Sequence, residues 1–204
     1  MSSLDPAFRA SLPSDAPYIA DLMITSAPAI NHYIFGEHFH RVCTEAFRNN
    51  RGIWAAKHAY VIAVGPQPVA IATFYPTRQA PFIVWDGVKF IFSLLGFKLG
   101  LKTFFRTLST ASIYKPFLKK SAYVANVACN TDFRGRGLAS LLMQSLEKLR
   151  VEAGVERFEL DVELDNTPAR KLYEKMGWTV RNMTIPTPRL PGVVRMVKEF
   201  QKTG

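Results

Sequence analysis

A glycine- and arginine-rich segment, residues 130–139 (NTDFRGRGLA), is the part of the sequence best suited to hold an anion. It follows an apolar run typical of a strand and precedes a long amphipathic helix. A helix start leaves free N–H groups and a partial positive charge, and both favour an anion. Gly135 and Gly137 let the backbone approach it, and Arg134 and Arg136 add full charges. The segment predicts a phosphate or pyrophosphate site; the alternative is a tight turn with two exposed arginines.

A dinucleotide-binding fingerprint fits this segment less well. That pattern needs a third Gly or Ala at the position of Ser140. It also opens the first strand–turn–helix unit of a chain, whereas this segment comes late. The phosphate-bearing ligand is therefore expected to be of another kind.

A predicted strand at residues 157–165 carries a row of carboxylates. Its acidic side chains alternate with apolar ones, so one face is acidic and the other apolar. An acidic face attracts a cation and repels an anion. The alternative is an ordinary strand with one solvated face. The acidic residues are Glu159, Asp161, Glu163 and Asp165.

The segment 160–178 (LDVELDNTPARKLYEKMGW) completes the pattern about thirty residues after the loop. Together the two segments resemble the GNAT superfamily of N-acetyltransferases. Residues 134–139 match its Q/R-x-x-G-x-G/A pyrophosphate loop. Its N-x-x-A…LY-x-x-x-GF block is matched by Asn166, Ala169 and residues 172–178. Trp178 stands where Phe is usual. The close resemblance covers about residues 121–180, and the order of elements from residue 8 agrees more loosely.

The resemblance implies that acetyl-CoA is the donor, that an amine is the acceptor, and that transfer is direct in a ternary complex. It assigns the pyrophosphate to backbone N–H groups of residues 135–139, and the pantetheine arm to exposed backbone of the preceding strand. An acetyl-cysteine step on Cys129 is a disfavoured alternative. The implied donor-binding residues are Val127, Ala128, Cys129, Arg134, Gly135, Arg136, Gly137, Leu138, Ala139 and Asn166.

Three residues are candidates for catalysis. Tyr173 matches the family tyrosine that protonates the leaving thiolate, and a phenol with a pKa of about 10 suits that step. The helical spacing of Tyr173 also fits an aromatic residue of the hydrophobic core with no catalytic role. Family members often carry a carboxylate where Asp161 stands, so we expect Asp161 first, and Glu163 second, to accept the amine proton through water. No Cys/His cluster suggests a metal, and the histidines match no motif.

The elements that must position these residues follow from apolar periodicity and turn signals. A first helix opens at residues 13–15, and further helices are expected at 37–48, about 137–153 and 168–176. The expected fold is α/β (α+β): a GNAT fold with a mixed central sheet, helices on both faces, and a splay between the fourth and fifth strands. Strands are predicted at 8–12, 60–64, 69–75, 122–129, 157–164, 178–185 and 193–200.

Residues 78–120 form a helical insertion before the fourth strand. They carry eight basic residues against Asp86 alone, which is most of the net charge of +10. From Phe90 to Leu108, apolar and basic residues fall largely on opposite sides of a helix softened by Gly96 and Gly100. Three roles remain open: a helix pair packed on the domain or on a second subunit, a lid over an apolar acceptor site, and attachment to anionic lipids.

Length and composition favour one domain, residues 1–204, that includes this insertion. Residues 1–10 lack a secretory signal, and the longest charge-free apolar run, 90–97, is too short to span a bilayer. We therefore expect a cytoplasmic enzyme, with Cys43 and Cys129 as free thiols. Because the basic excess sits in one segment rather than on the main fold, we expect no nucleic-acid partner.

The sequence therefore predicts an acetyl-CoA-dependent N-acetyltransferase that needs no metal and acts on a small-molecule or protein amine. A membrane contact and a homodimer stay open. Two other functions remain as alternatives. One is a non-catalytic CoA-binding or regulatory module of the same fold. The other is a peripheral membrane or interaction protein built around the basic amphipathic helix.

Overall fold

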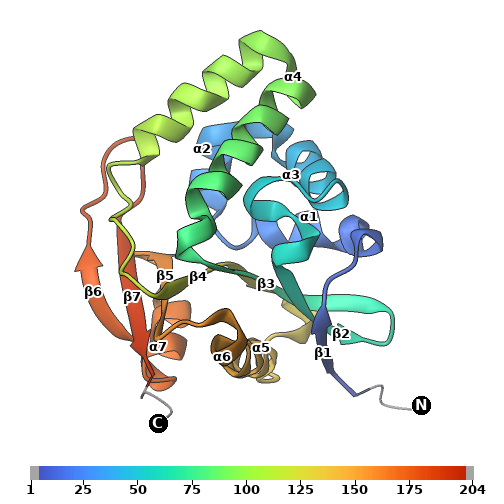
Figure 1. Ribbon diagram of the computed structural model, residues 1–204, viewed down its shortest axis with the longest axis vertical. Coiled ribbons are helices and arrows are strands. Elements are labelled where there is room, and N and C mark those ends of the chain that lie inside the picture. Colours follow the sequence, from blue (N-terminus) through green and yellow to red (C-terminus); the bar gives the residue numbers. More distant parts are fainter. Residues whose placement is uncertain (1–4, 201–204) are drawn as a thin grey trace.

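A mixed sheet of seven strands forms the centre of the protein (Figure 1). The computed structural model describes residues 5–200, so both ends of the predicted domain 1–204 lie outside the described residues. The strand order is β1-β2-β3-β4-β5-β7-β6, and β4 and β5 are the parallel pair. The strands are β1 (Ala7–Ala10), β2 (Ala59–Val64), β3 (Gln67–Pro76), β4 (Ser121–Cys129), β5 (Arg157–Glu163), β6 (Thr179–Met183) and β7 (Val193–Glu199).

Helices cover both faces of this sheet, as the sequence predicts (Figure 1). Side chains alternate between the faces of a strand, so the neighbours Val61 and Ile62 belong to two different cores. The core around Val61 contains α1, α2 and α3, and the core around Ile62 contains α5 and Tyr173 of α7. The helices are α1 (Ala16–Ile24), α2 (Pro28–Phe35), α3 (Phe39–Arg48), α4 (Ala80–Thr110), α5 (Leu138–Lys148), α6 (Arg150–Ala153) and α7 (Thr167–Lys175).

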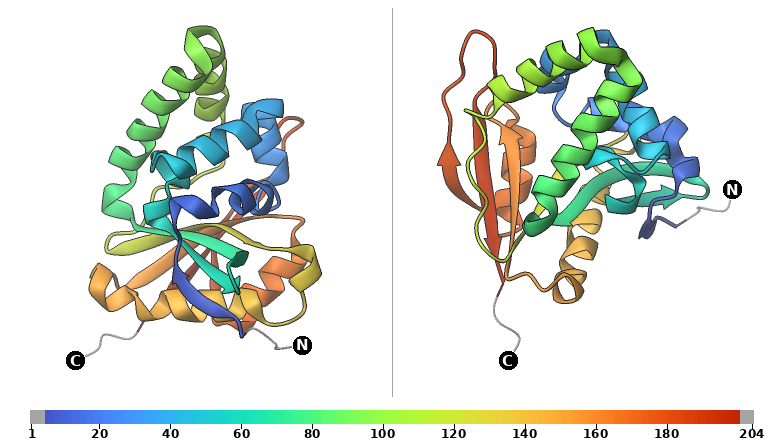
Figure 2. Two further views of the ribbon diagram at one scale, coloured as in Figure 1. Left: turned by 90° about the vertical axis from the view of Figure 1, so that its right-hand side faces the viewer. Right: turned by 45° about the horizontal axis from the view of Figure 1, so that its top comes forward.

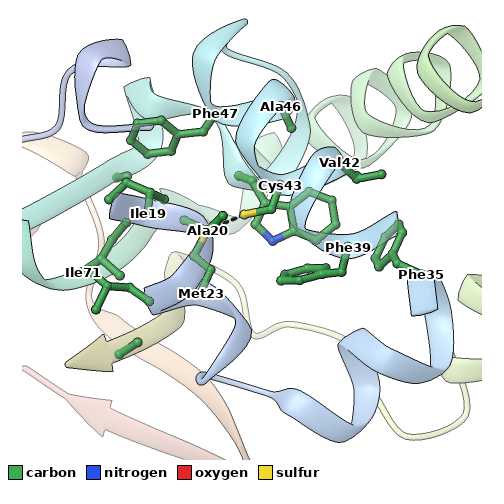
Figure 3. Packing of buried hydrophobic residues seen from close by; sticks show 14 of the residues in the cluster. Ile19, Ala20, Met23, Phe35, Phe39, Val42, Cys43, Ala46, Phe47 and Ile71 are labelled. Carbon is green, nitrogen blue, oxygen red and sulfur yellow. Dashed lines mark hydrogen bonds between the residues drawn. The ribbon is translucent and has the colours of Figure 1, made fainter. Parts of the chain in front are cut away.

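The core between α1 and α3 holds one of the two cysteines (Figure 3). The thiol of Cys43 donates a hydrogen bond to Sδ of Met23 at 3.3 Å. Burial raises the pKa of this thiol far above its usual range, so Cys43 stays protonated and unreactive. Cys129 at the end of β4 is half-buried, and both cysteines are free thiols, as expected.

The sequence missed one helix and misplaced several boundaries. Helix α2 was not predicted, because eight residues are too few to show a helical period in the usual window. The helix expected at 37–48 begins at Phe39, after a short 3-10 turn. The helix expected at about 137–153 is divided into α5 and α6. None of these differences changes the place of the 130–139 segment between β4 and α5.

Helix α4 begins ten residues earlier than the predicted stretch 90–108, and it is a hairpin of two arms. Gly96 has φ 75° and ψ 173°, so the helix breaks there, and the second arm returns toward the sheet (Figures 1 and 2). Gly100 does not break the helix. A Cβ at this position would lie 2.7 Å from the ring of Phe92, so the glycine lets the two arms pack closely.

The segment 77–110 is long and apolar enough to cross a membrane by length and composition alone. Basic residues interrupt its apolar run, which argues against a span. The structure adds a different obstacle. Gly96 divides the segment into two arms, and each is shorter than the about 20 helical residues that a bilayer requires.

A splay between β4 and β5 opens the middle of the sheet. Within the described residues the two strands pair only at Ser121–Tyr123 with Arg157–Glu159, and then they separate. A bulge in the β3–β4 ladder adds to this, since Asn126 takes a left-handed φ of 53° where the register shifts. The predicted splay between the fourth and fifth strands is therefore confirmed, and it leaves one edge of β4 without a strand partner.

Candidate active site

The 130–139 segment lies where β4 ends and α5 begins. Gly135 and Gly137 have φ 75° and 76°, a left-handed conformation that other residues seldom adopt. A Cβ added to either glycine would meet no described atom within 4 Å, so this side of the loop is open. Among the described residues, no side chain caps the start of α5, and the first N–H groups of the helix stay available. The loop therefore fits an anion such as a pyrophosphate.

The two arginines of the loop are exposed and only loosely held. Arg134 donates to the carbonyl of Cys129 at 3.4 Å, and Arg136 donates to the carbonyl of Asp132 at 3.2 Å. The guanidinium of Arg136 also lies over the ring of Phe133, 5.0 Å from its centroid. Neither arginine pairs with a carboxylate of the described residues, so both charges can serve an external phosphate.

The predicted pantetheine strand lies at the open edge of the splay. Ala128 and Cys129 pair with β3 on one side, and no described strand pairs with them on the other. Val127 lines a cavity that begins at this edge. Burial raises the pKa of the Cys129 thiol, while nearby Arg134 partly opposes the shift. Cys129 therefore carries no sign of an activated nucleophile.

A cavity of about 650 Å³ lies beneath α4 and extends into the splay. Helix α2 and both arms of α4 contribute apolar side chains to it. The sheet and α7 contribute the residues singled out from the sequence, because Asp161, Glu163, Asn166 and Tyr173 all line this one cavity. The structure thus brings the predicted catalytic residues together at its inner end.

The acidic face of β5 is not solvated, so the alternative of an ordinary strand with one solvated face does not hold. Glu159 is fully buried, and Arg195 of β7 is 2% exposed between Glu159 and Asp161. Register explains the pairing, because Asp161 lies directly opposite Arg195 across the β5–β7 ladder. The strand that carries the carboxylates is neutralised from the neighbouring strand.

Asp161 is fully engaged in this network. Its two oxygens accept hydrogen bonds from Nε and Nη2 of Arg195 at 2.6 and 2.7 Å. The hydroxyl of Tyr123 donates a third at 2.9 Å. Nη1 of Arg195 donates to Glu159 at 3.1 Å. Both oxygens of Asp161 are therefore committed to hydrogen bonds within the protein, which suits a positioning role.

Glu163 has the opposite character. Burial is the main cause that raises the pKa of its carboxyl, and nearby Asp165 adds to the shift. Backbone groups of Ile30 and Ala29, in the first turn of α2, favour the charged carboxylate and partly oppose this rise in pKa. Oε1 of Glu163 is buried and has no hydrogen-bond partner within residues 5–200. A carboxylate with a raised pKa and a free oxygen in a cavity is suited to accept a proton.

Tyr173 and Asn166 serve the fold as well as the cavity. The side chain of Tyr173 is 5% exposed and packs against Trp178, with ring centroids 5.9 Å apart. Burial raises the pKa of its hydroxyl, so Tyr173 stays protonated. Oδ1 of Asn166 accepts a hydrogen bond from the backbone N–H of Ala169 at 3.3 Å and so caps α7.

The sequence did not identify three parts of this site. They are Arg195, Tyr123 and the residues of α2 that lie near Glu163. One signal was available for Arg195, since a single arginine in the run VVRMVKE must find a carboxylate if the strand is buried. The partner itself lies 34 residues away and depends on register, so periodicity does not reveal it.

Comparison with known proteins shows the family of this chain. The Acetyltransferase (GNAT) family profile matches residues 27–178. The uncharacterized N-acetyltransferase YdgE of Bacillus subtilis (strain 168) is 38% identical over 65 residues, which are 32% of this chain and 41% of YdgE. The mycothiol acetyltransferase of Corynebacterium aurimucosum is 41% identical over 58 residues, 28% of this chain and 18% of that enzyme. This chain thus spans well under half the length of these two relatives.

The fold has relatives over its whole length. An N-acetyltransferase structure from Staphylococcus aureus Mu50 superposes with a TM-score of 0.69, at 19% sequence identity. The match covers 94% of this chain and 100% of that one, which shows a shared fold. Because the family profile covers most of the sequence, this chain belongs to the acetyltransferase (GNAT) family.

Proposed function

We propose that this protein transfers an acetyl group from acetyl-CoA to an amine, directly and within a ternary complex. One observation carries the proposal. The loop at Gly135 and Gly137 follows the free end of β4, and Val127 of that strand lines the cavity that also holds Glu163 and Tyr173. A donor held along the loop and the strand would therefore bring its acetyl group to this cavity.

The donor fits the residues at the splay. Its pyrophosphate would be held by the N–H groups of residues 135–139 and by Arg134 and Arg136, where a Cβ would otherwise fill the open space. The pantetheine arm would pair with the free edge of β4 at residues 127–129, which adds backbone hydrogen bonds without side-chain specificity. Bound there, acetyl-CoA supplies the activated acetyl group.

The chemistry needs a base for the amine and an acid for the thiolate. Glu163 would accept a proton from the bound ammonium and so leave a neutral amine that can attack the thioester, because its raised pKa makes it a stronger base than an exposed glutamate. Tyr173 would donate its hydroxyl proton to the departing sulfur, since burial keeps that proton in place until the thiolate forms. Both side chains line the same cavity.

Asp161 has a positioning role in this scheme. Its hydrogen bonds tie β5 to β7 through Arg195 and to β4 through Tyr123. The network fixes the strand that carries Glu163 two residues further on. The order expected from the sequence, Asp161 before Glu163, is therefore reversed in this proposal.

Release of free CoA thiol tests the proposal. The protein is mixed with acetyl-CoA and a mixture of primary amines, and thiol is measured with a chromogenic disulfide. Thiol release that requires both the amines and an intact Gly137 supports an acetyltransferase. Binding of acetyl-CoA without thiol release from any amine would favour the non-catalytic CoA-binding module.

A second candidate function is attachment to an anionic membrane surface. Large apolar side chains of α4 face solvent, including Phe97 at 73% and Phe105 at 61% exposure. Lys98 and Lys102 are exposed beside them, a combination typical of interfacial helices. Co-sedimentation with phosphatidylserine vesicles, lost in a Phe97→Asp/Phe105→Asp variant, would support this function. Equal sedimentation of both proteins would contradict it.

A further inference from the structure

The cavity beneath α4 is much larger than an acetyl group and an ammonium require. We infer that the acceptor is an amphiphilic primary amine, whose ammonium lies at Glu163 and whose apolar body lies under the α4 hairpin. This inference rests on the proposed acetyl transfer, and it narrows the acceptor to one chemical class.

The walls of the cavity are apolar over most of their length. The two arms of α4 contribute Ile83, Ile91, Phe92 and Phe104, and α2 contributes Ile30 and Ile34 from the opposite side. The volume of about 650 Å³ lies within the range of about 300–1,000 Å³ that is usual for small-molecule sites. A polar acceptor would leave this surface unused, whereas an alkyl or aryl body would bury it.

The cavity is continuous with the catalytic residues. The same space is bounded by Phe104 on the hairpin and by Glu163 and Tyr173 at the splay. One molecule can therefore hold its amine at the site of transfer and its body between α2 and α4. The hairpin then acts as the roof of an acceptor site, which is one of the roles left open by the sequence.

The charged side chains of the cavity favour an acceptor with a single ammonium group, placed at the end near Glu163. Within the described chain Asp161 and Glu163 are the carboxylates that line the cavity, and Lys115 and Arg195 are the basic side chains. Asp161 is neutralised by Arg195, and Glu163 keeps an oxygen without a partner. A single ammonium at Glu163 gains a charge-assisted hydrogen bond. A second ammonium at the hairpin end would be buried without a counter-charge, at a large cost.

A series of n-alkylamines tests the inference on the wild-type protein. Binding of n-butylamine to n-octylamine is measured by isothermal titration calorimetry without acetyl-CoA. Each added methylene should tighten binding about fourfold until the cavity is filled. The matched control is 1,8-diaminooctane, which has the length of octylamine but a second ammonium, and it should bind far more weakly than octylamine.

Two neighbouring phenylalanines give a matched pair of variants. Phe104 lines the cavity, whereas Phe105 points into solvent with 61% of its surface exposed. Phe104→Ser should weaken octylamine binding about tenfold or more, and Phe105→Ser should leave it within about twofold. Stabilisation by acetyl-CoA should be retained in both variants, which also checks that they fold.

Three results would overturn the inference. They are an affinity that does not change along the alkylamine series, equal binding of the diamine, and a gain with longer acyl-CoA chains in place of longer amines. Failure of the proposed function looks different, because acetyl-CoA would then fail to stabilise the protein or to release thiol. If the affinity does not change along the amine series while acetyl-CoA still binds, the amphiphilic acceptor is rejected and the proposed acetyl transfer is not.

Discussion

Replacing Asp161 by asparagine separates the structural carboxylate from the catalytic one. The asparagine amide would keep the shape of the side chain but lose the charge that faces Arg195. The guanidinium is 2% exposed, so it would remain buried with Glu159 as its acidic partner. The substitution should therefore act on stability first.

The size of the effect follows from the burial of the pair. Breaking a buried ion pair typically costs about 3–5 kcal/mol. Because Glu159 still contacts Arg195, we expect the lower end, about 3 kcal/mol. For a chain of this length about 1 kcal/mol shifts Tm by about 2–4 °C, so Tm should fall by about 6–12 °C.

Glu163→Gln is the matched companion. Oε1 of Glu163 has no partner in the described chain, so the amide should change Tm by no more than about 4 °C. Turnover should fall about 10²–10⁴-fold, because the proton acceptor is lost.

The raised pKa of Glu163 also fixes the sign of two pH effects. In the wild type the rate should rise with pH through this pKa, above the ordinary glutamate value of 4.5, and this limb should be absent in the Gln variant. The folded protein holds the Glu163 proton more tightly than the unfolded chain does. This contribution to stability is therefore complete below pH 4.5 and is lost as pH rises through the folded pKa.

Both variants are measured by thermal unfolding and by steady-state thiol release. Stability is read first, and turnover is compared at a temperature where each variant is folded. The reasoning would be refuted if Asp161→Asn kept the wild-type Tm but lost turnover, while Glu163→Gln turned over normally. That result would make Asp161 the base, as the sequence alone suggested.

Two further predictions concern the donor side. Tyr173→Phe should lower turnover about 10²–10⁴-fold while acetyl-CoA affinity is nearly unchanged, and wild-type turnover would return Tyr173 to a pure core role. Acetyl-CoA at 100 times its Kd should stabilise the wild type by about 2.7 kcal/mol, a Tm rise of about 5–11 °C in differential scanning fluorimetry. Gly137→Val should largely abolish this rise in Tm, because a Cβ would enter the open side of the loop at φ 76°. A full rise in a folded variant would argue against pyrophosphate binding at this loop.

Local patterns in the sequence predicted the order of strand, loop and helix around residues 130–139. The loop at Gly135 and Gly137 and the strand before it are contiguous, so motif and periodicity were sufficient to locate them. The splay between β4 and β5 followed from the resemblance to the family, and the structure confirms it. The helices on both faces were likewise expected.

The acceptor side depends on contacts between distant segments, and there the sequence was insufficient. Alternation along β5 gave an acidic face, but only the register with β7 reveals that Arg195 buries and neutralises it. The free oxygen of Glu163 depends on α2, which is too short to predict from periodicity. A helix pair was one of the roles left open for residues 78–120, but no helical period predicts that the break at Gly96 folds the pair over a cavity.

The central claim is that the acetyl group moves directly from acetyl-CoA to an amine at the splay of β4 and β5. A single-turnover experiment with isotopically labelled acetyl-CoA and n-octylamine tests it most directly, with the label followed by mass spectrometry in the amine and on the protein. Direct transfer predicts labelled N-acetyloctylamine in step with free CoA and no label on Cys129. Label that first accumulates on Cys129, or CoA released without any acetylated amine, would contradict it.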